Sequence, residues 1–198
     1  MKFISPIRAA VACVAIAVLS GCAHNISISG DSAALTTGAK PQQIDKIVGL
    51  VITDEQRMID VTTPGGGGDK VTYKPYRDLE FPIYLELSRT FKNVVKLSSF
   101  PDEAAARNRG ISYIVTPQIV TDSSSPSIVT WPPTDFSVTL TCSVADPSGK
   151  IIAQPVVRGS GHAEFDEFKH NLGLAAQRAT VDTVSKLPAA MLDVPALR

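Results

Sequence analysis

The sequence predicts an α+β fold, a two-layer sandwich in which a mostly antiparallel sheet carries two main helices on one face. Three observations lead to this prediction. Apolar and polar residues alternate from Asp135 to Ala145, a turn and a second extended stretch follow, and residues 78–93 and 170–190 repeat apolar side chains at helical spacing. Strands joined by a tight turn are antiparallel, and helices with one apolar stripe bury it against the sheet.

The first part of the predicted domain contains a buried strand and a hairpin. Residues 44–53 are nearly all apolar at their end, which predicts a central strand covered on both faces. Residues 54–57 form a polar turn, and two short extended stretches at 58–63 and 70–73 flank a glycine tip at Gly65–Gly68. A phosphate-binding loop is disfavoured, because it needs a Lys after the glycines and Asp69 stands there instead.

The predicted helix at 78–93 takes Asp78 as its N-cap, and its first turn tolerates Pro82. A short strand at 94–98 and a short helix at 101–108 follow. Gly110 is expected to end that helix.

The last part of the chain predicts three more strands and the closing helix. Pro117 places the strand at 111–120 at an edge or a bulge, and Pro155 does the same for the hairpin partner at 151–158. The glycines around Ser160 indicate a bulge in the stretch 159–165 that extends this partner. In the helix at 170–190, many alanines permit close packing on the sheet, and Pro188 is expected to end or kink it.

The N-terminus has the order of a bacterial secretory signal. Basic residues come first, a short apolar run extends from Ala9 to Leu19, and small residues follow. The run is too short for an ordinary spanning helix, which needs about 20 apolar residues. Residues 19–22 (Leu-Ser-Gly-Cys) resemble a lipoprotein lipobox. The resemblance implies cleavage between Gly21 and Cys22 and acylation of both the Cys22 thiol and its new amino group, which anchors the chain firmly. No other cofactor is expected.

These features divide the chain into a signal peptide at 1–21, a flexible tether at 22–43 and one domain at 44–198. The tether is rich in Ser, Thr, Gly, Ala and Asn. Without Lys2 and Arg8 of the signal, the chain has 17 basic and 19 acidic residues. This near-neutral balance disfavours nucleic acid as a partner, so attachment to the membrane depends on the lipid.

No catalytic or metal-binding pattern stands out, and the sequence predicts a protein that is not an enzyme. Cys142 is the one cysteine left after Cys13 is removed and Cys22 is acylated, and a buried, inert thiol is expected. His162, Glu164 and Asp166 share one face if their segment is a strand, but this is a weak metal pattern that solubility alone explains. We therefore predict no metal site.

The strongest candidate for a partner contact is Trp131-Pro132-Pro133, a lone Trp beside two stiff prolines in a Ser-rich loop. The alternative is that Trp131 closes over the sheet edge as a lid. The glycine tip at 65–68 and the loop at 123–127 are weaker candidates of the same kind.

Beyond the lipobox, the chain resembles small α+β outer-membrane lipoproteins that act as auxiliary subunits, with the YajG-like lipoproteins the most similar. The resemblance covers residues 44–187 and rests on the stretches 47–52, 90–94, 113–117 and 144–150, none of which is catalytic. The broader set includes lipoprotein activators of peptidoglycan synthases and the lipoprotein partner of the lipopolysaccharide translocon.

This resemblance implies a lipid-anchored accessory subunit that holds or activates an envelope protein complex. Ala23 is not the Asp that usually retains a lipoprotein in the inner membrane, so the outer membrane, facing the periplasm, is expected. The alternative is an auxiliary lipoprotein that binds a lipid or small apolar ligand for a transport system, which predicts a roomy apolar cavity between sheet and helices.

Overall fold

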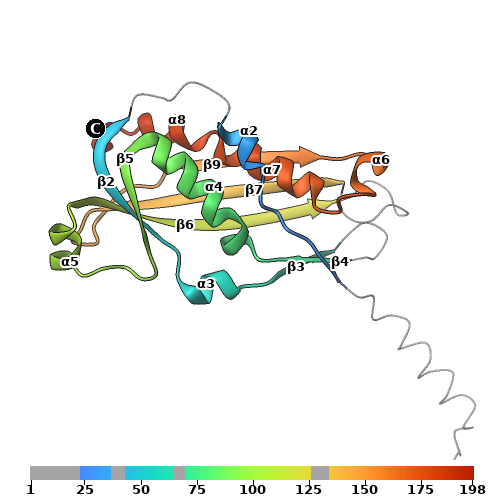
Figure 1. Ribbon diagram of the computed structural model, residues 1–198, viewed down its shortest axis with the longest axis horizontal. Coiled ribbons are helices and arrows are strands. Elements are labelled where there is room, and N and C mark those ends of the chain that lie inside the picture. Colours follow the sequence, from blue (N-terminus) through green and yellow to red (C-terminus); the bar gives the residue numbers. More distant parts are fainter. Residues whose placement is uncertain (1–22, 37–42, 65–69, 126–133) are drawn as a thin grey trace, which may run out of the picture.

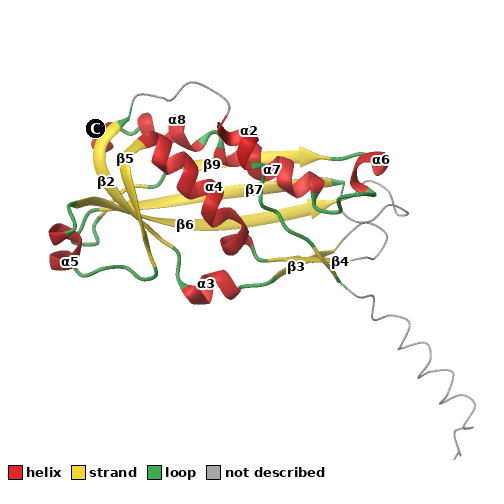
Figure 2. Ribbon diagram, in the orientation of Figure 1, coloured by secondary structure: helices red, strands yellow, loops and turns green. Residues whose placement is uncertain are grey.

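The computed structural model describes residues 23–36, 43–64, 70–125 and 134–198 (Figure 1). It has the predicted α+β architecture, with a main sheet, a smaller sheet and helices gathered mostly on one face (Figure 2). The strands are β1 (His24–Asn25), β2 (Ile44–Val51), β3 (Val61–Pro64), β4 (Lys70–Tyr73), β5 (Phe91–Leu97), β6 (Ile111–Ser124), β7 (Asp135–Ala145), β8 (Ile151–Ala153) and β9 (Val156–His162). The helices are α2 (Ser32–Thr36), α3 (Asp54–Met58), α4 (Pro75–Thr90), α5 (Glu103–Asn108), α6 (Phe165–Phe168), α7 (Leu174–Val184) and α8 (Leu187–Leu192), with a final 3₁₀ turn at Pro195–Leu197.

The main sheet is mixed. Its strand order is β5-β2-β6-β7-β8, and β9 pairs with β7 further along that strand. The antiparallel pairing predicted for most of the sheet holds for β6 to β9, whereas β2 runs parallel to both β5 and β6. The parallel part arises because helices α4 and α5 return the chain before β5 and β6, so that each strand starts from the same end as β2. The predicted central position of β2 is confirmed.

Strand β7 has the predicted bounds and the predicted alternation. Its inward side chains Phe136, Val138, Leu140, Cys142 and Val144 are all buried. Pro117 of β6 faces Cys142, beyond the residues at which β6 pairs with β2. The missing N–H of Pro117 therefore costs no hydrogen bond, although β6 lies between β2 and β7 and is not the predicted edge strand.

Helices α4 and α7 contact each other and cover the same face of the sheet, with α7 lying over β7 and β9 and α4 over β5 and β6 (Figures 1 and 2). The predicted helix at 170–190 is two helices, because the chain leaves the α7 axis at Ser185 and Lys186 and Pro188 stands in the first turn of α8. The predicted close packing is confirmed: Ala175, Ala176 and Ala179 are buried.

The glycines of β9 serve a different purpose from the predicted bulge. The pairing of β7 with β9 runs without a break from Thr141–Val156 to Asp135–His162. A Cβ atom on Gly159 or Gly161 would overlap backbone atoms of α7. These glycines therefore let the helix lie directly on the strand.

Residues 23–36, which we expected in a flexible tether, belong to the fold. Strand β1 pairs parallel with β4, and the side chains of Ile28 and Leu35 are buried in the main core. The amide of Ile28 donates a hydrogen bond to Oδ2 of Asp78 (3.1 Å), and Thr180 Oγ1 donates to the carbonyl of Ile28 (2.7 Å). Asp78 is thus a buried residue within α4, which begins at Pro75, and is not its N-cap.

The predicted hairpin at 58–73 is confirmed by the antiparallel pair β3–β4, which forms the small sheet with β1. The turn expected at 54–57 is helix α3, closed by a capping box between Thr53 and Gln56. Two hydroxyl pairs join the small sheet to β6: Tyr73 with Thr121 (2.6 Å) and Thr63 with Ser123 (2.7 Å).

Candidate binding surfaces

Several predicted site residues lie outside the described part of the chain. These are Gly21 and Cys22 of the lipobox, the glycine tip at 65–68 and the Trp131-Pro132-Pro133 segment. Of the loop at 123–127, residues 123–125 are described, and Ser123 is bonded to Thr63. In the described ranges, no helix is both long and apolar enough to cross a membrane.

The face of the main sheet opposite α4 and α7 presents a polar surface, which we call the outer face. It consists of aligned rows across β6, β7 and β9, because residues paired across strands point to the same side. The rows are Gln118–Thr141–Val156, Val120–Thr139–Arg158, Asp122–Ser137–Ser160 and Ser124–Asp135–His162. Most of these side chains are exposed, so rigid strands hold a preformed surface of hydroxyl and charged groups there.

Only part of this side of the sheet is covered by helix among the described residues. At the far end, α5 packs over a second apolar cluster of Val51, Leu97, Ala106, Ile111 and Ile114. Figure 1 shows α5 at the end of the molecule opposite α6. Among the described residues, no helix covers the remaining rows of the outer face.

The free edge of β9 is blocked by side chains of α7 and of the turn that follows it. Arg178 Nη1 donates to the carbonyl of His162 (2.7 Å), Asp182 Oδ2 accepts from the amide of Ser160 (3.0 Å), and Lys186 Nζ donates to the carbonyl of Arg158 (2.9 Å). Arg178 and Asp182 lie one turn apart on α7, and Lys186, in the turn after the helix, continues their line along β9. An added strand would have to displace all three, which makes the outer face, rather than this edge, the available surface.

His162 joins the end of β9 to the start of β7 and to α6. Its Nδ1 lies 2.7 Å from Oδ1 of Asp135 and its Nε2 lies 3.0 Å from Oε1 of Glu164. The hydrogen bond with Glu164, and then that with Asp135, raise the pKa of His162 and favour the imidazolium form. Asp166, predicted to share a face with these groups, pairs with Lys169 instead because α6 begins at Phe165 and turns it away. Within the described residues, no group of three or more His, Cys, Asp or Glu side chains is placed to hold a metal ion.

Cys142 is fully buried and has a free thiol, as expected. Burial raises the pKa of the Cys142 thiol to about 12. At neutral pH the thiolate is therefore scarce and out of contact with solvent, which is unsuited to nucleophilic chemistry.

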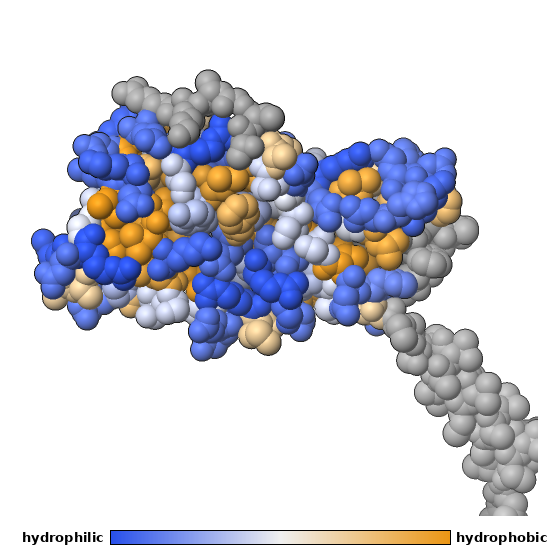
Figure 3. Space-filling model, viewed as in Figure 1, coloured by the Kyte–Doolittle hydropathy of each residue, from blue (hydrophilic) through white to orange (hydrophobic). Residues whose placement is uncertain are grey.

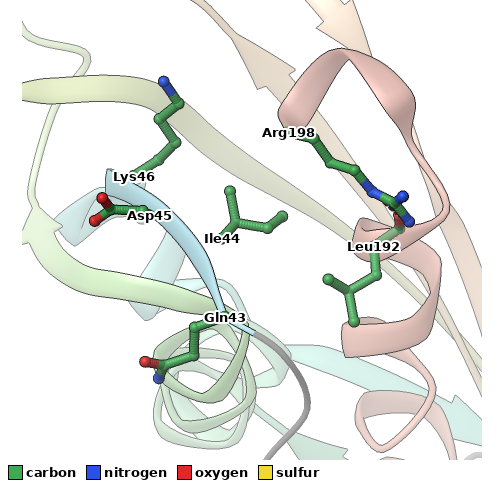
Figure 4. Close-up of a pocket in the computed structure, with 6 residues that line it drawn as sticks. All are labelled: Gln43, Ile44, Asp45, Lys46, Leu192 and Arg198. Atoms are coloured by element: carbon green, nitrogen blue, oxygen red, sulfur yellow. Dashed lines mark hydrogen bonds between the residues drawn. The ribbon is translucent and has the colours of Figure 1, made fainter.

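Two open depressions lie at opposite ends of the sheet. One, of about 420 Å³, is polar and lies over the end of the outer face, where Asp122, Ser124, Asp135, Ser137, Ser160 and His162 line it. The other, of about 530 Å³, lies between the start of β2 and the C-terminal residues (Figure 4). In it Ile44 and Leu192 provide apolar surface, and the guanidinium of Arg198 turns back to the carbonyl of Leu192 (2.6 Å from Nη2).

The helix-covered side shows hydrophobic residues at several separate places among hydrophilic ones (Figure 3). The most exposed large apolar side chains are spread over the molecule and include Met58, Phe165, Val120 and Ile151. Such scattered exposure among the described residues is ordinary for a folded chain.

Comparisons with known proteins give little to add to this geometry. No family model matches the chain, and no curated protein matches it. Among solved structures, the chain is similar to the crystal structure of protein XCC0632 from Xanthomonas campestris, from the family DUF330. That match has 9% sequence identity and a TM-score of 0.48, and it covers 84% of this chain and 92% of the other.

The line of charged side chains along β9 is the feature that the sequence interpretation missed. The signal was present, since Arg178, Asp182 and Lys186 recur at helical spacing beside the alanine stripe. Their contacts with the backbone of β9 depend on the strand lying beside the helix. The spacing alone does not indicate this, because charged residues on a helix usually face solvent.

Proposed function

We propose that this protein is a lipid-anchored, periplasm-facing outer-membrane lipoprotein that acts as a non-enzymatic accessory subunit of an envelope protein complex. The lipid on Cys22 would confine the domain near the bilayer and raise its effective concentration beside a membrane-bound partner. The lipobox supports the anchor, and the outer face supports the binding role.

The outer face is the observation that carries the binding role. Strands β6, β7 and β9 hold its side chains in fixed rows, so a partner would meet a surface that needs little ordering on association. Its mixture of hydroxyl, amide and charged groups suits the polar contacts of a regulatory protein interface more than the burial of an apolar ligand.

The chemistry of the candidate catalytic groups supports a non-enzymatic role. The thiol of Cys142 is buried and protonated, and both ring nitrogens of His162 are engaged by carboxylates. A general base needs a free ring nitrogen within reach of its substrate proton.

The test combines mass spectrometry with crosslinking in cells. We expect the mature N-terminus to be an acylated Cys22, and a photoreactive residue at Ser137 on the outer face to give adducts with envelope proteins. The same residue at the exposed Ala189 of α8 is the matched control and should give fewer adducts. An unmodified Cys22 would refute the anchor, and equal adducts from both positions would refute the outer face as the binding surface.

A second candidate function is the binding of a lipid or small apolar ligand for a transport system. The depression beside Ile44 and Leu192 favours it, since its volume of about 530 Å³ falls in the range of ligand pockets. It lies at the end of the sheet rather than between sheet and helices, and polar residues share its lining. Saturable binding of a fluorescent fatty acid that Leu192→Gln weakens would favour this function over the first.

A further inference from the structure

The register of β1 shows where the chain leaves the domain toward Cys22. His24 pairs with Val71 and Asn25 with Thr72, and the amide of Ile26 donates to the carbonyl of Thr72 (2.9 Å). Because the pairing is parallel, Ala23 lies next to the start of β4, at the end of the small sheet where Pro64 and Lys70 also lie. Because Cys22 directly precedes Ala23 in the sequence, an anchor on Cys22 would join the domain at that end.

The segment that joins this point to the core is short and is fixed by hydrogen bonds. Only four residues separate Ala23 from Ile28, whose side chain is fully buried. The backbone of Ile28 is fixed at both its amide, by Asp78, and its carbonyl, by Thr180. Acyl chains on Cys22 would therefore attach to the folded body itself rather than to a flexible linker.

The same end of the molecule carries other described elements. Figure 1 shows the β3–β4 hairpin, the end of β6, the start of β7 and helix α6 together there, with α5 at the opposite end. The hydrogen bond between Thr63 and Ser123 joins the hairpin to the end of β6. Phe165, the first residue of α6, is 59% exposed there, whereas the exposed Phe100 precedes α5 at the far end and is 45% exposed.

Most charges around Phe165 are balanced by partners. Asp166 pairs with Lys169 (2.7 Å), Glu167 pairs with Arg178 (2.7 Å), and His162 lies between Asp135 and Glu164. Among the described charges around Phe165, all cancel except one of the two carboxylates on His162, so this end has no excess of positive charge and fits a zwitterionic rather than an anionic lipid surface.

We propose that this end of the molecule faces the bilayer in a fixed orientation. The end is defined by Ala23, the β3–β4 hairpin and α6, and it places Phe165 at the interface. The α5 end then points away from the membrane. The outer face of β6, β7 and β9 runs roughly parallel to the bilayer normal, where a partner in the periplasm can reach it. This inference rests on the lipidation proposed above.

The experiment uses the lipidated protein in phosphatidylcholine vesicles that contain brominated lipids. Trp131, the one Trp of the chain, is replaced by Phe, and a single Trp is introduced as Phe165→Trp or, as the matched control, Phe100→Trp. We expect a blue shift and a several-fold larger loss of fluorescence for Phe165→Trp than for Phe100→Trp. A flexible Gly–Ser insertion between Cys22 and Ala23 should reduce that difference, because it frees the domain from its anchor point.

Three outcomes would overturn the proposed orientation. Equal quenching at the two positions in protein whose Cys22 is acylated overturns the orientation and leaves the accessory role intact. An unmodified Cys22, read by mass spectrometry of the same sample, overturns the anchored function and the orientation with it. A difference that the Gly–Ser insertion does not reduce would also overturn the proposal, since docking of residues 23–28 would then not be its cause.

Discussion

Asp182 of α7 accepts a hydrogen bond from the backbone amide of Ser160 in β9, with 3.0 Å between Oδ2 and N. Burial raises the pKa of Asp182, but the hydrogen bonds from Lys186 and from the Ser160 amide outweigh it and lower the pKa overall. The carboxylate therefore stays ionised and keeps its place on the strand edge. A charged helix stripe that satisfies strand backbone groups closes an edge that could otherwise pair with another chain.

Asp182→Ala should expose that edge. We expect a loss of about 1 kcal/mol in the free energy of unfolding, because the hydrogen bond to the Ser160 amide is removed and the exposed pair with Lys186 adds little. Hydrogen exchange of the Ser160 amide should accelerate, while Asp182→Asn, which keeps an acceptor oxygen, should restore part of its protection. Asp45→Ala is the control, since it removes an exposed ion pair with Lys92 that holds no strand edge. Unchanged exchange at Ser160 in Asp182→Ala would contradict the edge role.

Gly161→Ala should separate the helix from the sheet. The added Cβ would overlap the carbonyl oxygen of Ala175 and the amide of Ala179, which are backbone atoms and cannot rotate away. We expect a loss of about 1–3 kcal/mol in denaturant unfolding, as for other overpacked sites. Ser160→Ala, at the neighbouring outward position, should change stability by at most about 0.5 kcal/mol. If the two variants were equally stable, the close contact of α7 with β9 would be wrong.

The sequence predicted the elements whose pattern is local. Strand 135–145 matched its bounds because every second side chain is buried on one face, and the turn after it matched because Asp146 accepts from the amides of Ser148 and Lys150. Gly149, with φ of 89°, provides the conformation that this turn needs.

Features that depend on distant partners were not predictable in this way. Ile26 and Ile28 alternate with serines over only four residues, and Leu35 has no large apolar partner three or four positions away, so the stretch resembles a Ser-rich tether. Gly159 and Gly161 looked like a bulge because the helix that needs them lies about 20 residues further along the chain. The parallel pairing of β2 with β5 and β6 depends on how α4 and α5 return the chain, which a strand's own residues do not encode.

The His162 bridge predicts a dependence of stability on pH. Its pKa is raised in the folded protein, by Glu164 first and Asp135 second, so the imidazolium form is favoured on folding. The stabilisation is complete below the unfolded pKa, near 6.5, and is lost as the pH rises through the higher folded value. The charge of His162 also helps to lower the pKa of Glu167, so the two side chains interact electrostatically.

Two measurements check this. In an NMR titration, Asp135→Asn should lower the pKa of His162 relative to the unmodified protein, because one of the two carboxylates is removed. His162→Gln should make the free energy of unfolding vary less between pH 6 and pH 8. A pKa of His162 that does not respond to Asp135→Asn would show that the 2.7 Å contact is not maintained in solution.

Arg89→Ala should be among the most damaging single changes on α4. Arg89 Nη1 lies 3.1 Å from Oε1 of the fully buried Glu86 and also donates to the carbonyl of Leu35, so it joins α4 to the docked N-terminal segment. Removing it leaves a buried carboxylate without its cation, which costs about 3–5 kcal/mol. Arg107→Ala breaks an exposed ion pair with Glu103 and should cost at most about 1 kcal/mol, which makes it the matched control.

The pH dependence distinguishes this mechanism from a simple loss of packing. Burial raises the pKa of Glu86, against the opposing effect of Arg89, so the folded protein binds a proton there more readily than the unfolded chain. Stability contributed at this site is therefore lost as the pH rises from the unfolded pKa through the folded one. The deficit of Arg89→Ala should shrink on acidification, when Glu86 is neutral, and urea unfolding at several pH values measures it. A deficit equal at all pH values would mean that Arg89 stabilises through its packing and its bond to Leu35, not through the charge of Glu86.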